Sequence, residues 1–369
     1  MSLRVLVVDD TVVFRRIVSD ALTGLPGVEV VGTASNGKLA LARMAALQPD
    51  LVTLDIEMPE MNGIEVLEAM GPAGPKAGVI VLSSLTTRGG EMTVRALELG
   101  AFDFLTKPDR GAPTENLAHL RECLRPMLRA FERRRDIRAM LGRDGVAPPQ
   151  ANTPAMCPST TASAALEPPV ARRPSAGPPL VLIGVSTGGP TALAVLLPSL
   201  PRDLNAPVLI VQHMPAMFTK PLAASLGRKS LLRVTEARDG EVAEPNCAYI
   251  APGGAHMKVV AGTRGETILR ITDDPAENGC KPAADYLFRS VALQFPGRAV
   301  ATILTGMGND GTAGLRLLKR GGCRSIAQDE ASCVVFGMPK EAIGAGLIDT
   351  VAPLDRIAAA IVRSVREGA

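Results

Sequence analysis

Short apolar runs alternate with longer segments of mixed hydrophobic and polar residues along most of this chain. A short apolar run between turn-forming residues is typical of a buried strand, whereas apolar positions that recur with the helical period indicate an amphipathic helix. In the first third of the chain this pattern predicts strands over residues 3–8, 28–34, 51–54, 79–82 and 102–105, and helices over 13–22 and 37–47. Such alternation indicates an α/β domain built on a doubly wound parallel sheet.

The same alternation returns after a break in the middle of the chain. We expect strands over residues 180–183, 207–212 and 299–304, a helix that begins at Pro190 and another over 312–320. Strands that alternate with helices again predict a parallel sheet. The predicted fold class is therefore α/β, with two doubly wound parallel-sheet domains.

The break between the two patterns starts near residue 145. Its sequence, GVAPPQANTPAMCPSTTASAALEPPVARRPSAGPP, is rich in Pro, Ala, Ser and Thr and shows no apolar period. A segment of this composition cannot bury enough apolar surface to offset the entropy lost on ordering. We therefore expect domains at residues 1–127 and 179–366, joined by a flexible linker over 128–178. Within that linker, residues 130–142 read as the tail of the first domain's last helix.

Composition narrows the possible function classes. The 40 basic and 37 acidic residues nearly balance, so the charge does not favour a nucleic-acid partner. No apolar run is long enough to span a membrane, and MSLRVLVVDD lacks the features of a signal peptide, so we expect a cytoplasmic protein without membrane insertion. The six Cys residues form no C-x-x-C pair, which predicts reduced thiols rather than disulfides or zinc ligands.

The carboxyl ends of the first domain's strands carry Asp9, Asp10, Asp55, Ser83 and Lys107. In a doubly wound sheet these ends share the edge at which ligands bind. Carboxylates gathered there repel one another unless a hard cation neutralises them, and oxygen ligands suit Mg²⁺. The lysine and the hydroxyl suit an incoming phosphoryl group, and one carboxylate can act as a nucleophile that forms an acyl phosphate. Together the five residues indicate a phosphoryl-transfer site.

The second domain begins with a strand that runs into a glycine-rich turn, LVLIGVSTGGP over residues 180–190. Unpaired N–H groups at the start of the next helix face the crevice, so Ser186 is expected to lie exposed beside donors for an oxyanion. The turn alone equally fits a phosphate-binding loop, since it matches neither G-x-S-x-G nor G-x-G-x-x-G. A dinucleotide site would carry an acidic residue after the next strand, but His213 stands there, which favours a hydrolase.

Ser186, His213 and Asp310 all follow predicted strands, so we expect them at one edge of the second sheet. His213 can take the serine proton near neutral pH, and Asp310 can hold the other imidazole nitrogen. The order Ser, His, Asp along the chain differs from three well-known triads, so geometry must test the assignment. His256 is the alternative base, and the backbone N–H of Met307 is a candidate oxyanion donor.

Residues 1–127 resemble the receiver domain of two-component response regulators, through the motifs VLVVDD, LDIEMPEMNGIEVL, VLSS and FLTKP. The resemblance implies a flavodoxin-like fold in which a histidine kinase of the chemotaxis type phosphorylates Asp55. It also implies that Asp10, Asp55 and the backbone carbonyl of Glu57 bind Mg²⁺, with Asp9 acting through water.

The same resemblance assigns roles to residues on the neighbouring strands. Ser83 and Lys107 are expected to bind phosphoryl oxygens, Phe104 stands at the position of a switch aromatic, and the Lys107–Pro108 bond is expected to be cis. Fusion of a phosphoacceptor domain to a hydrolase domain predicts that the first domain controls access to the hydrolase site. We expect the unphosphorylated first domain to cover Ser186 with the surface near Ser83 and Phe104, and phosphorylation to release it.

The second domain resembles the catalytic domain of the chemotaxis protein-glutamate methylesterases, the CheB family, through IGVSTGGP, VQHMP, YIAPGGAHM, LTGMGNDGTAGL and AQDEASCVVFGMPKEA. The resemblance implies a Rossmann-like serine hydrolase. The implied roles are Ser186 as nucleophile, His213 as base, Asp310 as orienting acid, the Met307 N–H as oxyanion donor, and Thr187 and His256 as site-lining residues. Lys281 stands where the family commonly has Arg, which leaves the substrate contacts open.

The resemblance implies hydrolysis of glutamate γ-methyl esters on methyl-accepting chemoreceptors, with release of methanol, and deamidation of glutamine on the same proteins. It implies no cofactor in the esterase site, and we expect a monomer. Two alternatives stay open on the residues alone. One is a serine hydrolase with another ester substrate, and the other is a non-catalytic regulator that binds receptors.

Overall fold

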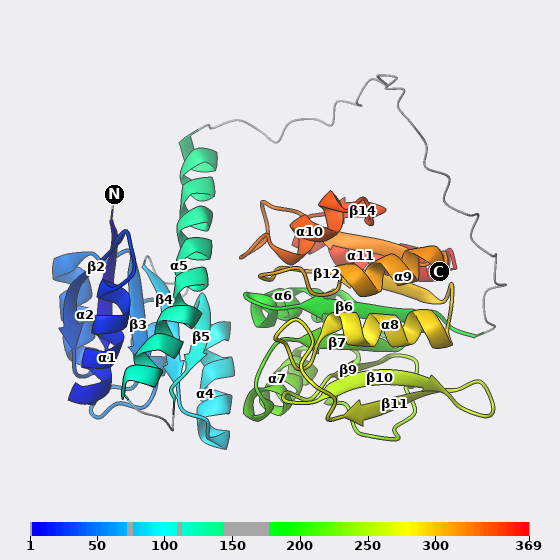
Figure 1. The fold of residues 1–369 in the computed structure, drawn as a ribbon, viewed down its shortest axis with the longest axis horizontal. Helices are drawn as coiled ribbons and strands as arrows, with labels where there is room; N and C mark the ends of the chain where they lie inside the picture. Colours follow the sequence, from blue (N-terminus) through cyan, green and yellow to red (C-terminus); the bar gives the residue numbers. More distant parts are fainter. Residues whose placement is uncertain (1, 72–76, 109–112, 144–176, 369) are drawn as a thin grey trace.

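Two α/β domains stand side by side in the computed structural model, which describes residues 2–71, 77–108, 113–143 and 177–368 (Figure 1). Each domain has its own parallel sheet with helices on both faces. This confirms the predicted fold class. Most of the expected linker, residues 144–176, lies outside the described residues, so its expected flexibility stays a prediction.

The first domain is built on a five-stranded parallel sheet with the order β2-β1-β3-β4-β5. Its strands are apolar nearly throughout because helices cover both faces, as expected for a parallel sheet. The strand bounds are β1 (Leu3–Val8), β2 (Val28–Ala34), β3 (Leu51–Asp55), β4 (Gly78–Ser83) and β5 (Asp103–Thr106). Two of these agree with the prediction at both ends, and β5 begins one residue later than predicted.

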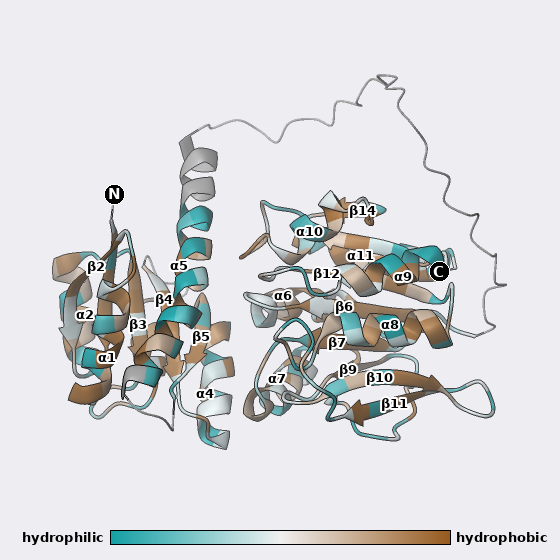
Figure 2. Cartoon of the chain, viewed as in Figure 1, coloured by the Kyte–Doolittle hydropathy of each residue, from teal (hydrophilic) through white to brown (hydrophobic). Residues whose placement is uncertain are grey.

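The helices of the first domain divide between the two faces of its sheet. The face covered by α1 and α5 buries Val18, Leu22, Leu120 and Leu124, while α2, α3 and α4 cover the other. The bounds are α1 (Val12–Thr23), α2 (Gly37–Leu47), α3 (Gly63–Ala69), α4 (Thr87–Glu98) and α5 (Pro113–Arg143). Helix α5 continues well past residue 127, the expected domain boundary, and the coloured part of its extension, up to residue 135, is largely hydrophilic (Figure 2).

The second domain has a seven-stranded parallel sheet with the order β14-β13-β12-β6-β7-β9-β8. The chain starts at β6, moves outward on one side through β7, and returns to build the other side from β12, so the order reverses between β6 and β12. Such a switch point opens a crevice at the carboxyl ends of the strands. The strands are β6 (Leu180–Val185), β7 (Val208–Gln212), β8 (Arg233–Glu236), β9 (Cys247–Ile250), β12 (Ala299–Ile303), β13 (Arg324–Gln328) and β14 (Thr350–Ala352).

Helices and a hairpin complete the second domain. Phe218 and Leu222 of α7 pack on one face of the sheet with α6 and α11, and Leu287 and Phe288 of α8 pack on the other with α9 and the hairpin. The bounds are α6 (Gly189–Leu196), the 3₁₀ turn η1 (Leu197–Ser199), α7 (Ala216–Lys229), β10 (His256–Ala261), β11 (Thr267–Thr272), α8 (Ala284–Gln294), α9 (Thr312–Arg320), α10 (Met338–Gly344) and α11 (Leu354–Arg366).

The two domains pack against each other through α4 and α7 (Figure 1). A Cβ atom on Gly90 would lie 2.4 Å from the carbonyl oxygen of Met217, so the helices approach at a point where a glycine is required. The Phe104 and Phe218 rings lie 4.8 Å apart, centroid to centroid. Glu98 accepts hydrogen bonds from Lys229 Nζ (2.8 Å) and from the Ser225 hydroxyl. The surface near Phe104 is therefore the docked surface.

None of the described helices is both long enough and apolar enough to cross a membrane.

Candidate active site

The carboxylates of the first domain gather around one lysine. Lys107 Nζ lies 2.7 Å from Asp9 Oδ2 and 2.7 Å from Asp55 Oδ2. Ligand atoms of Asp9, Asp10 and Asp55 lie within 4.8 Å of one another. Asp9 and Asp55 are buried, while Asp10 is exposed to solvent. Three carboxylates at this spacing fit a hard divalent cation such as Mg²⁺.

Burial has the largest effect on the pKa of Asp55. Burial, opposed by the Lys107 ammonium and reinforced by Asp9, raises the pKa of Asp55 to about 6. The raised value reflects a carboxylate in a low-dielectric site with another carboxylate beside it. A bound cation would offset that cost, because it supplies positive charge in addition to Lys107.

Ser83 and Phe104 lie on β4 and β5 next to this cluster. Ser83 is buried, and its hydroxyl accepts a hydrogen bond from Thr93 Oγ1 (2.6 Å) on α4. Phe104 is half-buried against Phe218 of the second domain. The expected cis bond at Lys107–Pro108 is wrong: among the described residues, the cis peptide bond lies at Lys281–Pro282. Lys107 reaches both carboxylates without it.

Ser186 follows β6 at the switch point of the second sheet. Its backbone is held tightly: Ser186 N–H donates to the Thr305 carbonyl (3.0 Å), and Gln212 Nε2 donates to the Ser186 carbonyl (3.0 Å). Gln212 Nε2 also donates to the His213 carbonyl (3.1 Å). The loop after β12 comes close enough that a Cβ on Gly306 would lie 2.8 Å from Ser186 Cβ. A glycine is therefore required beside the serine.

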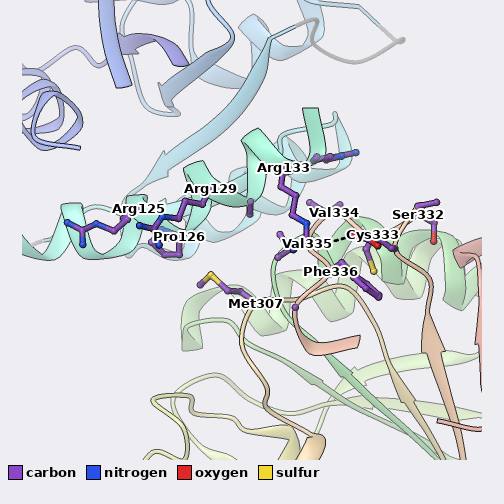
Figure 3. A pocket seen from close by; sticks show the side chains of 15 residues that line it. Arg125, Pro126, Arg129, Arg133, Met307, Ser332, Cys333, Val334, Val335 and Phe336 are labelled. Carbon is purple, nitrogen blue, oxygen red and sulfur yellow. Dashed lines mark hydrogen bonds and ion pairs between the residues drawn. The ribbon is translucent and has the colours of Figure 1, made fainter. Parts of the chain in front are cut away.

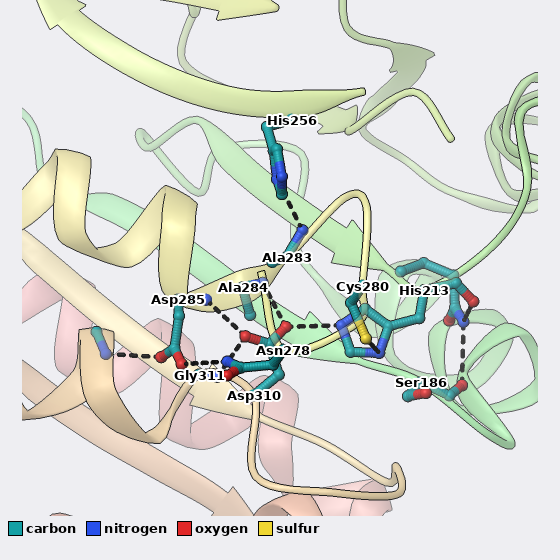
Figure 4. Close-up of polar contacts among 12 residues, drawn as sticks. Ser186, His213, His256, Asn278, Cys280, Ala283, Ala284, Asp285, Asp310 and Gly311 are labelled. Atoms are coloured by element: carbon teal, nitrogen blue, oxygen red, sulfur yellow. Dashed lines mark hydrogen bonds and ion pairs between the residues drawn. The ribbon is translucent and has the colours of Figure 1, made fainter. Parts of the chain in front are cut away.

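His213 and Asp310 form the base–acid pair that the sequence predicts. His213 Nε2 lies 2.7 Å from Asp310 Oδ2 (Figure 4). Asp310 Oδ2 also accepts from Ala284 N–H (2.6 Å), and Oδ1 accepts from Asp285 N–H (3.0 Å) and Gly311 N–H (3.0 Å). The carboxylate thus sits at the N-terminus of α8, where backbone donors favour negative charge.

These hydrogen bonds set the charge of the pair. Burial alone would raise the pKa of Asp310, but hydrogen bonds with His213 and with the backbone outweigh burial and hold the pKa below its usual value. Burial alone would lower the pKa of His213, yet its contacts with Asp310 and Cys280 raise it to about 9. These contacts therefore favour the protonated form of His213, and only the neutral imidazole can serve as a base.

The other imidazole nitrogen has an unexpected neighbour. Cys280 Sγ lies 3.6 Å from His213 Nδ1, and Figure 4 shows the ring between Asp310 and this thiol. Ser186 lies on the same side of the crevice, with its carbonyl bonded to Gln212. Within the described residues, the polar contact of Nδ1 is thus Cys280.

The three residues expected to line the site lie in different places. Met307 is 42% exposed in the loop after β12. Thr187 is half-buried directly after Ser186, and its carbonyl accepts from Thr305 Oγ1 (2.9 Å). His256 is fully buried, with Nε2 3.0 Å from the Pro275 carbonyl and Nδ1 accepting from Ala283 N–H (3.3 Å). Its position differs from the expectation, because both nitrogens hold the backbone rather than face the crevice.

Thr187 also connects the two domains. Burial raises the pKa of Asp103, at the start of β5, to about 6, although hydrogen bonds from Phe104 N–H and the Thr187 side chain lower it. A buried carboxyl group of the first domain thus contacts the residue that follows Ser186.

A cavity of about 510 Å³ lies between α5 of the first domain and loops of the second (Figure 3). It is lined by Arg125, Arg129 and Arg133 of α5 and by Met307 and the 330–337 loop. Arg133 also forms an ion pair with Glu330 (2.7 Å) across the domain boundary.

Three residues with roles at the site escaped the sequence reasoning. Gln212 precedes His213 and looks like the last residue of a buried strand, and no pattern shows that its amide holds two carbonyls. Cys280 lies in a polar loop, and the Cys count alone marked it only as a reduced thiol. In the sequence, Asp103 is an acidic residue at the start of a strand, with no sign of a special role. In the structure it is buried.

Comparisons with known proteins identify the same two domain families that the sequence motifs resemble. A family model described as CheB methylesterase matches residues 181–361, and one described as response regulator receiver domain matches residues 5–117. A protein-glutamate methylesterase/protein-glutamine glutaminase of Desulfotalea psychrophila is 50% identical over 368 residues, which cover 99% of both chains. The Bacillus subtilis protein of the same name is 44% identical over 99% of both chains.

A solved structure resembles the second domain. The crystal structure of the Thermotoga maritima CheB methylesterase catalytic domain matches with a TM-score of 0.50 and 41% identity, over 51% of this chain and 99% of that chain.

Proposed function

The chain belongs to the family of CheB methylesterases that carry a receiver domain, and on that basis we propose that it is a phosphorylation-activated protein-glutamate methylesterase and protein-glutamine deamidase. Its substrates are methyl-accepting chemotaxis receptors, and its phosphodonor is a histidine kinase of the chemotaxis type. It acts in the cytoplasm as a monomer. The observation that carries the proposal is the 2.7 Å His213–Asp310 contact beside Ser186 in the crevice of the second sheet.

The mechanism follows from which imidazole nitrogen Asp310 holds. Asp310 holds Nε2 of His213, so Nδ1 takes the proton from Ser186 as its Oγ attacks the γ-carbonyl of the methyl ester. The Met307 N–H stabilises the oxyanion. His213 then returns the proton to the leaving methoxide, and methanol departs.

The second half of the reaction regenerates the enzyme. Water, with its proton taken by Nδ1 of His213, attacks the acyl-enzyme; the bond between the acyl carbon and Ser186 Oγ breaks, His213 returns the proton to Oγ, and the glutamate carboxylate is released. A glutamine substrate follows the same course with ammonia as the leaving group. Both reactions use groups of this chain alone, so we propose that the esterase site needs no cofactor.

Asp55 is the proposed phosphoacceptor of the first domain. Asp9, Asp10, Asp55 and the Glu57 carbonyl would hold Mg²⁺, which neutralises the charge that gathers when a phosphoryl group approaches the carboxylates. Lys107, already 2.7 Å from Asp55, and Ser83 would bind the phosphoryl oxygens. Ser83 accepts a hydrogen bond from Thr93 of α4 and would donate its own hydroxyl hydrogen to the phosphoryl group, which couples that group to α4 and therefore to the docked surface.

Methanol release from methylated receptor preparations tests this proposal. We expect release by the full chain, faster release after addition of Mg²⁺ and a small-molecule phosphodonor, and none above background from Ser186→Ala. Release by Ser186→Ala at the wild-type rate would contradict the assignment of the nucleophile. No release by any form, with release from other esters, would favour a hydrolase with another substrate.

A further inference from the structure

Cys280 lies where the base of the proposed esterase must work, and the mechanism above gives it no role. It belongs to the loop between β11 and α8, is half-buried, and follows the exposed residues Asn278 and Gly279. Its Sγ lies 3.6 Å from His213 Nδ1 (Figure 4). Cys280 is thus partly exposed to solvent, and its thiol contacts the proposed catalytic imidazole.

The hydrogen-bond geometry shows which imidazole nitrogen is basic. Asp310 accepts from three backbone N–H groups as well as from His213, so it acts as a carboxylate acceptor. Nε2 of His213 therefore carries the hydrogen that points to Asp310, and in the neutral ring Nδ1 carries the lone pair. Ser186 and Cys280 need that same lone pair.

Cys280, His213 and Asp310 thus form a nucleophile–base–acid arrangement that shares two members with the proposed triad. An imidazole in contact with a thiol can accept its proton, and the thiolate is the reactive form of cysteine. The other described cysteines lack this arrangement. Burial raises the pKa of Cys323 and Cys333, and Cys123 contacts His119 (3.7 Å), which has no carboxylate partner among the described residues. Cys247 is buried and accepts a hydrogen bond from Arg233 Nε (3.3 Å) instead of contacting an imidazole.

We propose that Cys280 is a thiol modification site that switches the esterase off by forming a mixed disulfide with a low-molecular-weight disulfide. This inference rests on the proposed function and adds a regulation to the same site. His213 Nδ1 takes the Cys280 proton, and Sγ attacks one sulfur of the small disulfide. A bond forms between Sγ and that sulfur, the original S–S bond breaks, and the released thiolate takes the proton from the imidazolium.

The step balances without another oxidant, because the small disulfide is reduced to a thiol as Cys280 is oxidised. The attached group then fills the space next to Nδ1. Ser186 loses access to its base, and an ester loses access to Ser186. Reduction of the mixed disulfide removes the group and restores the site.

Incubation of the full chain with glutathione disulfide tests the proposal. We expect peptide mass spectrometry to find glutathione on Cys280, methanol release to fall in proportion to the modified fraction, and dithiothreitol to restore it. Methanol release by Cys280→Ser should be the same with and without glutathione disulfide, even if this variant is slower or faster than the wild type. Cys123→Ser and Cys157→Ser, matched controls that remove a thiol elsewhere, should be inhibited like the wild type.

Two further variants separate the failure of this inference from failure of the proposed function. Ser186→Ala has no esterase to inhibit, yet its Cys280 should be modified at the wild-type rate. His213→Gln should slow the modification of Cys280 about tenfold or more, because the proton acceptor is gone. Inhibition of Cys280→Ser equal to that of wild type, or equal modification of Cys280 and Cys123 in wild type, would overturn the inference.

Discussion

The Phe104 ring of the receiver domain lies 4.8 Å from the Phe218 ring of the catalytic domain, inclined by 37°. Phe104 stands two residues after Phe102 on the strand that leads to Lys107, whose ammonium contacts Asp55. Phe218 lies in α7, which starts shortly after His213. This one contact therefore joins the neighbourhood of the proposed phosphoacceptor to that of the proposed catalytic base.

Weakening the docked surface should raise the activity of the unphosphorylated protein. Glu98→Ala removes hydrogen bonds to Lys229 and Ser225 across the interface. Loss of these partly buried, charge-assisted bonds should favour the undocked form and increase basal methanol release roughly three- to tenfold. Glu68→Ala is the matched control, because Glu68 pairs with Arg95 (3.3 Å) on the receiver surface alone. Equal rates of methanol release for the two variants would argue against the hypothesis that docking of the receiver domain inhibits the esterase.

Removal of the receiver domain should have a larger effect than loss of one contact. A fragment that starts near residue 178 should hydrolyse methylated receptors faster than the unphosphorylated full chain, because the receiver domain then no longer packs on α7 or contacts Thr187. Rates are compared at equal concentrations of enzyme. If the fragment is no faster than the full chain, simple occlusion is wrong, and phosphorylation must build activity in another way.

Activation should require Asp55 and a divalent cation. Asp55→Ala should stay at its basal rate when Mg²⁺ and a small-molecule phosphodonor are added, because no acyl phosphate can form. Chelation of Mg²⁺ should block activation of the wild type and leave the isolated catalytic fragment unaffected. A chelator that slowed the fragment would instead place a metal requirement in the esterase site.

The triad should behave as one unit. Ser186→Ala, His213→Gln and Asp310→Ala should each lower kcat by roughly 10⁴-fold or more, and the triple variant should be little worse than Ser186→Ala. Circular dichroism provides the control that each variant is folded. Near-wild-type turnover by His213→Gln, together with inactivity of His256→Gln, would make His256 the base.

The pH profile should report the ion pair around His213. An imidazolium cannot accept a proton from Ser186, so kcat/KM should rise with pH until about 9, the raised pKa of His213. Cys280→Ala removes one of the contacts that raise this pKa, so its profile should shift to lower pH. Rates of Ser186→Ala are subtracted at each pH to remove spontaneous ester hydrolysis. A wild-type plateau already reached at neutral pH would contradict the prediction.

The sequence by itself determined the elements and the general place of the chemistry. The runs that became β1 and β2 are mainly apolar and are bounded by polar or turn residues, so their limits and those of the helix Thr312–Arg320 are local properties. Ser186 and His213 directly follow strands, Asp310 lies in the loop between β12 and α9, and parallel topology brings strand ends to one edge. The contact between His213 and Asp310 therefore follows from pattern and topology.

Only the tertiary structure decided which atoms touch. Cys280 and His213 are separated by 67 positions, and nothing in the loop that carries Cys280 shows that it folds over the imidazole. His256 is the first residue of β10, and packing turns its ring toward the Pro275 carbonyl and Tyr286. The Glu98–Lys229 pair spans 131 positions and two domains. Contacts of this kind depend on how separate surfaces fit together, and a pattern of hydrophobic and polar positions along one segment carries no information about the surface that will meet it.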